Sequence, residues 1–128
     1  MSRRRVVITG LGIVSPVGIG VETAWANIVA GKSGIGRITR FDASAYPSQI
    51  AGEVKGFDAT QYIPAKDARR MDTFIHYGLA AALEAFKDSG IAVTEQNAER
   101  IGVNIGSGIG GLPLIEQTHD ALLAGGPR

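Results

Sequence analysis

Two segments of this chain combine an apolar run, a glycine turn and a helical pattern, in that order. Residues 4–10 form the first apolar run, and a helical pattern follows at 21–30. Residues 101–105 form the second, followed by the turn from Gly106 to Gly111 and a helical pattern over 111–124. This order is typical of α/β proteins, which place functional groups above the carboxyl ends of parallel strands. The sequence therefore predicts an α/β fold, with 4–10 and 101–105 as buried parallel strands.

The remaining elements follow from periodicity and from residues that stop helices. An apolar stripe at Ile75, Leu79, Leu83 and Phe86 predicts a long helix over 72–89, with Asp72 as its N-cap and a glycine at its end. The alanines beside this stripe let other backbones approach, so we expect that helix to be deeply buried. Alternation predicts a short strand over 50–54, and residues 31–48 are expected to be a loop.

Composition limits the classes of function. The chain has 128 residues, 45% hydrophobic and 20% charged, which indicates one globular segment over 1–128 without an internal boundary. A net charge of +1 provides no global field for nucleic acid or a membrane surface. No apolar run is long enough to span a bilayer, and a cytoplasmic location is predicted. Cysteine is absent, which excludes disulfides and a cysteine nucleophile within these residues.

The turn from Gly106 to Gly111 has the spacing G-x-G-x-x-G after an apolar run and before a helix. A nucleotide pyrophosphate on the helix N-terminus is one interpretation of this spacing. An acidic residue about 20 positions later is missing, however, because the chain ends first. A tight turn that needs glycine for packing is the favoured interpretation. Neither glycine turn has the G-x-S-x-G spacing of a serine hydrolase.

Few side chains in this sequence indicate a metal-binding or anion-binding site. The two histidines are too few to predict a metal site. His76 follows Asp72 by four residues and is expected to pair with it along a helix face, and His119 is expected to be a packed or hydrogen-bonded helix residue. Lys66, Arg69 and Arg70 form a concentrated basic cluster. It is interpreted either as a solvated surface turn or as a docking patch for an acidic protein or a phosphate.

Taken together, the motifs along the whole chain resemble the amino-terminal part of the β-ketoacyl-acyl-carrier-protein synthases, most closely the type II bacterial form. The matching motifs are RRVVITGLGIVSPVG at 4–18, GKSGI at 31–35, FDASAY at 41–46, RMD at 70–72, DSG at 88–90, IGSGIGG at 105–111 and GGPR at 125–128. The resemblance implies a thiolase-like fold of layered α/β/α/β/α architecture, of which this chain would be about the first third.

The resemblance also implies a function. The family elongates fatty acids by decarboxylative Claisen condensation: a cysteine takes the acyl chain, malonyl carrier protein loses carbon dioxide, and the carbanion attacks the thioester. Two histidines and a lysine assist, with no metal or dissociable cofactor, in a homodimer. All four catalytic residues are expected after Arg128, so no catalytic residue is assigned to this chain, and the segment alone is predicted to be inactive.

Two roles carry over by position. Ile109 resembles the residue that borders the acyl-chain pocket, where a β-branched side chain would gate chain length. Lys66, Arg69 and Arg70 resemble the basic patch that receives the acidic acyl carrier protein. Two other functions stay open on the residues alone: a nucleotide-binding unit built on Gly106 to Gly111, and a non-enzymatic carrier-protein docking fragment.

Overall fold

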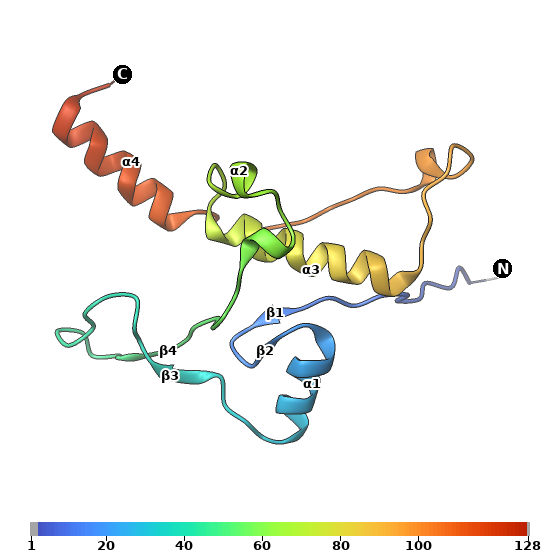
Figure 1. Cartoon of the computed structure of the whole chain (residues 1–128), viewed down its shortest axis with the longest axis horizontal. Helices are drawn as coiled ribbons and strands as arrows, with labels where there is room; N and C mark the ends of the chain where they lie inside the picture. The colour runs from blue at the N-terminus through green and yellow to red at the C-terminus, as the bar shows by residue number, and fades with distance from the viewer. Residues whose placement is uncertain (1–2, 128) are drawn as a thin grey trace. The chain divides into compact units, whose positions relative to one another are not determined.

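The computed structural model describes residues 3–127 (Figure 1). Contacts divide the chain into two compact units. The first unit contains the residues up to Asp58 together with Ala80–Ala92, and the second contains Ala59–Leu79 together with the residues from Val93 onward. In chain order the elements are β1 (Val14–Ser15), β2 (Gly18–Ile19), α1 (Val21–Val29), β3 (Ile35–Arg37), β4 (Ile50–Gly52), η1 (Ala59–Gln61), α2 (Ala65–Ala68), α3 (Thr73–Ser89), η2 (Ala98–Arg100) and α4 (Leu112–Gly125).

In the first unit, the segment before β1 lies against the C-terminal half of α3. Gly10 and Gly12 allow this approach, because a side chain on Gly12 would collide with the backbone of Ala81 and Ala85. The Glu84 carboxylate accepts hydrogen bonds from the backbone N–H of Ile13 (3.0 Å) and from that of Val21 (2.7 Å), at the start of α1. One carboxylate on α3 therefore holds both the entering segment and the first helix.

Two antiparallel hairpins complete the first unit. Strands β1 and β2 form a tight pair with Val14 opposite Ile19. Strands β3 and β4 pair with Ile35 opposite Gly52 and Arg37 opposite Ile50. The predicted strand over 50–54 is confirmed by β4, but its partner β3 lies in a stretch that was expected to be a loop. The reason is physical: β3 exists through its pairing with β4, and its own glycine-rich sequence carries no strand pattern.

The helix predictions are confirmed. The helices expected at 21–30, 72–89 and 111–124 are α1, α3 and α4. Gly31 and Gly90, which follow α1 and α3, have φ of +67° and +65°, the left-handed conformation that glycine adopts without steric cost. Among the described residues, no helix is both long enough and apolar enough to cross a membrane.

The two predicted parallel strands are wrong within this structure. Residues 4–10 and 101–105 carry no assigned secondary structure, and Val6, Ile8 and Val103 are 83–90% exposed. A β-branched run becomes a strand only where a neighbouring strand supplies its hydrogen bonds, and no described segment pairs with either run. Both strands in each hairpin that does form are antiparallel.

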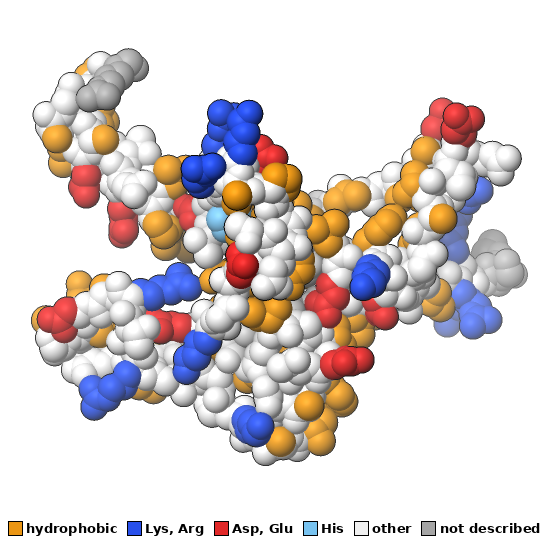
Figure 2. Space-filling model, viewed as in Figure 1, with side chains coloured by type: hydrophobic (Ala, Val, Ile, Leu, Met, Phe, Trp, Pro, Cys, Tyr) orange, Lys and Arg blue, Asp and Glu red, His pale blue; other side chains and the backbone are white. Residues whose placement is uncertain are grey.

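The expected deep burial of α3 is also wrong here. Of its residues only Ala80 is buried, and Leu83 and Phe86 are about half exposed. The buried apolar residues of the described chain are small, apart from one isoleucine: Ala24, Ala43, Ile63, Ala68 and Ala80. Many larger apolar side chains are open to solvent, and orange patches in the space-filling view mark them (Figure 2). The apolar stripe of α3 is thus present but uncovered.

Candidate functional site

Lys66, Arg69 and Arg70, here called the basic segment, lie on the short helix α2 and the turn that follows it. Backbone hydrogen bonds from Ala68 N–H to Pro64 and from Arg70 N–H to Asp67 close this turn. All three cationic side chains are exposed, whereas Ala68 between them is buried. Figure 2 shows blue side chains gathered over α2. The three cations thus lie within five residues, on one short helix and the turn after it.

The electrostatic surroundings leave these charges available. Arg69 donates a hydrogen bond from Nε to the carbonyl oxygen of Ala65 at 3.2 Å. Among the described residues, no carboxylate lies within salt-bridge distance of any of the three cations. A cluster of exposed cations that is not neutralised locally attracts an acidic partner, more strongly at low salt.

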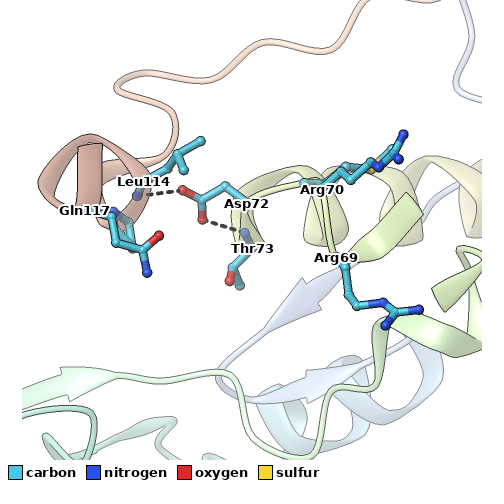
Figure 3. A pocket seen from close by; sticks show the side chains of 8 residues that line it. Arg69, Arg70, Asp72, Thr73, Leu114 and Gln117 are labelled. Atoms are coloured by element: carbon cyan, nitrogen blue, oxygen red, sulfur yellow. Dashed lines mark hydrogen bonds between the residues drawn. The ribbon is translucent and has the colours of Figure 1, made fainter. Parts of the chain in front are cut away.

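An open hollow of about 230 Å³ lies beside the basic segment, and every residue that lines it belongs to the second unit. Figure 3 shows Asp72 between the starts of α3 and α4, with the side chains of Arg69 and Arg70 directed away from it. The lining residues are Arg69, Arg70, Met71, Asp72, Thr73, Pro113, Leu114 and Gln117.

Asp72 connects two helix starts. One carboxylate oxygen accepts a hydrogen bond from the N–H of Thr73, the first residue of α3, at 2.6 Å. The other accepts from the N–H of Leu114, in the first turn of α4, at 3.3 Å. A negative charge is stabilised at helix N-termini because unpaired N–H groups point outward there. Asp72 directly precedes α3, as its prediction as N-cap requires, but its side chain bonds to the first helical residue and not to the second or third. The contact with α4, across 42 residues of sequence, has no local signal.

The turn from Gly106 to Gly111 leads directly into α4. Ser107 Oγ accepts a hydrogen bond from the N–H of Gly110 at 3.1 Å, and Gly110 has φ of +84° beside the ring of Phe74. Ile109 lies between Ser107 and Gly110 in the sequence, and its side chain is 74% exposed. A neighbouring apolar hollow of about 320 Å³ is lined by Phe74, Ile75, Gly78, Leu79, Ile105, Gly106 and Ser107, and Ile109 is not among its lining residues.

Neither histidine belongs to a chemical cluster. His76 Nε2 lies 2.9 Å from the carbonyl oxygen of Ala68, so a structural role is supported, although the expected pairing with Asp72 is wrong. His119 is 65% exposed and lies 3.9 Å from the Asp120 carboxylate, so the expected packing is wrong. Within residues 3–127, no group of three or more His, Cys, Asp or Glu side chains is arranged to hold a metal ion.

The nucleotide interpretation of the glycine turn meets an electrostatic obstacle. The N-terminus of α4 would have to receive a phosphate, but the carboxylate of Asp72 already accepts from Leu114 N–H there. A second anion at this position would be repelled, and a side chain on Gly111 would collide with the same carboxylate. The geometry therefore favours the packing interpretation of these glycines.

Known proteins match this chain over its whole length. Two 3-oxoacyl-[acyl-carrier-protein] synthase 2 proteins, from Vibrio cholerae serotype O1 and Coxiella burnetii, are 58% and 53% identical over all 128 residues. The chain spans 31% of the length of each. Two solved structures superpose on this chain with TM-scores of 0.75. The ishigamide ketosynthase/chain length factor is 33% identical, and the match covers 98% of this chain and 31% of that chain. A type II polyketide ketosynthase in complex with its acyl-carrier protein is 28% identical, and the match covers 97% of this chain and 32% of that chain.

These neighbours are thiolase-like ketosynthases, so the predicted fold class, a partial α/β domain of that architecture, is confirmed. The sequence profile described as "Beta-ketoacyl synthase, N-terminal domain" matches residues 3–126. Because that match covers nearly the whole chain, this protein belongs to the β-ketoacyl synthase family.

Proposed function

We propose that this chain is the N-terminal third of a 3-oxoacyl-[acyl-carrier-protein] synthase that elongates fatty acyl chains. The observation that carries this proposal is the 58% identity to such a synthase over all 128 residues. In the proposed reaction, a cysteine thiolate takes the acyl group from acyl carrier protein and releases the carrier thiol. Malonyl carrier protein then loses carbon dioxide, and the resulting carbanion attacks the acyl-cysteine thioester, which forms the 3-oxoacyl carrier protein and frees the cysteine. The parent enzyme is proposed to be a cytoplasmic homodimer without a cofactor.

The chain contains no cysteine, so it does not supply the nucleophile of this reaction. Its contribution is binding and positioning. We therefore expect the 128 residues alone to be inactive in a condensation assay with acyl and malonyl carrier protein. Product formation by this segment would contradict the assignment of the catalytic groups to other parts of the enzyme.

The basic segment is proposed to dock the acidic carrier protein. Three exposed cations within five residues, none neutralised by a described carboxylate, provide a local positive field on a chain with a net charge of only +1. A related ketosynthase has been solved in complex with an acyl-carrier protein, which supports a carrier as the partner. Ile109, at the tip of the glycine turn, is proposed to border the acyl pocket once that pocket is complete.

Charge reversal tests the docking role. In the full-length enzyme, replacing Lys66, Arg69 and Arg70 together by Glu should raise the KM for acyl carrier protein by roughly tenfold or more at low salt. The increase should shrink as salt is added, because exposed charges are screened. The rate with acyl-coenzyme A, which has no carrier protein, should change far less. Replacing Lys32, Arg37 and Lys55 together by Glu is the matched control, because it reverses three exposed charges outside the basic segment. An unchanged KM, or an equal rise in the control, would contradict the docking role.

A further inference from the structure

We infer that Asp72 is a positioning residue for the glycine turn and that it helps set which acyl chain lengths the enzyme accepts. The inference rests on the proposed function, because the acyl substrate is part of that proposal. Its structural basis is independent of it. Asp72 is the residue at which the basic segment, the start of α3 and the start of α4 meet.

The turn from Gly106 to Gly111 is held at two places. Its front part is closed locally by the hydrogen bond between Ser107 Oγ and Gly110 N–H. Its end is held from outside: Gly110 lies beside the Phe74 ring, and Gly111 lies so close to the Asp72 carboxylate that a Cβ atom would overlap it. Ile109 is thus on the part of the turn immediately before the positions that α3 and Asp72 hold.

Asp72 binds the starts of α3 and α4 through both of its carboxylate oxygens. The Asp72 carboxylate is anchored at 2.6 Å to Thr73, and its other oxygen receives Leu114 N–H at 3.3 Å. Charged acceptors form stronger hydrogen bonds than neutral ones, and both bonds lie at helix N-termini that favour a negative charge. Asp72 itself is only partly exposed, although its bond with Leu114 is open to solvent. Losing the charge should therefore free the start of α4 and the turn before it.

The position of the turn affects which acyl chain lengths fit the pocket. A side chain that closes the end of a pocket discriminates between chain lengths only if its backbone stays in place, since a mobile turn yields to a longer acyl group. With Asp72 intact, Ile109 is held near its observed position. Without that hold, the enzyme should accept a broader range of acyl lengths.

The test uses the full-length enzyme and two variants that break the same contact in different ways. Asp72→Asn removes the charge, and Gly111→Ala places a methyl group where the carboxylate lies; the φ of Gly111 is −89°, which alanine tolerates. Asp67→Asn is the matched control, because it removes an equal charge from exposed α2 without touching α4. Hydrogen exchange of the peptide containing Leu114 is measured together with kcat/KM for a series of acyl carrier proteins.

We expect both variants to speed exchange at Leu114 by about tenfold and to flatten the chain-length profile. Asp67→Asn should change neither readout. Faster exchange with an unchanged profile, or an equal change in the control, would overturn the inference. Should one variant fail to fold, the other still decides. If the wild-type enzyme itself fails to condense acyl and malonyl carrier protein, the proposed function is refuted instead, and the exchange data still report on the contact.

Discussion

Glu84 provides the sharpest test of how the first unit is held together. Its carboxylate accepts from two backbone N–H groups, Ile13 at 3.0 Å and Val21 at 2.7 Å, which are 71 and 63 residues away in sequence. Hydrogen bonds to a charged group contribute about 1.5–3 kcal/mol each, and both bonds here are partly buried, so we use the lower value. Glu84→Ala should therefore lower the free energy of unfolding of this unit by about 3 kcal/mol.

The assay is residue-specific hydrogen exchange at Ile13 and Val21, supported by urea denaturation. A loss of about 3 kcal/mol corresponds to exchange that is roughly a hundredfold faster at both amides. Glu84→Gln retains one acceptor oxygen and should lose about half as much. Glu22→Gln is the control, since Glu22 is exposed in the first turn of α1 and removes the same charge. If Glu84→Ala behaves like this control, the two hydrogen bonds do not stabilise the unit and the reasoning fails.

Three further predictions concern packing, pH and substrate. Gly12→Ala should destabilise the first unit by about 1–3 kcal/mol in urea denaturation, because the added Cβ would overlap the Ala81 carbonyl. Gly36→Ala should be near neutral, because the atom nearest to its added Cβ is 3.9 Å away. Hydrogen bonds from the Thr39 side chain and backbone lower the pKa of Glu53 from its ordinary 4.5. The contribution of Glu53 to stability is therefore complete above pH 4.5 and is lost as the pH falls through the lowered pKa. An NMR titration should show the lowered pKa, and Thr39→Val should return it toward 4.5. In the full-length enzyme, Ile109→Phe should shorten the longest acyl chain accepted, and an unchanged product profile would remove Ile109 from the pocket.

Local patterns in the sequence were sufficient to locate the helices. Helical periodicity and the glycines after α1 and α3 depend on residues within a few positions of each other, and the structure confirms them. The same is true of Asp72 as the residue before α3. The family was also readable from sequence, because its motifs lie in register along the whole chain.

The tertiary structure decided everything that depends on a partner distant in sequence. Residues 4–10 and 101–105 have the composition of buried strands, yet no described segment hydrogen-bonds to them, so they are extended and exposed. The second oxygen of Asp72 meets Leu114, and Glu84 meets Ile13 and Val21, through contacts that no local pattern encodes. Helices satisfy their own backbone hydrogen bonds, so residues close together in the sequence determine them. Strand pairing and carboxylate bridges, in contrast, require two segments distant in the sequence to come together.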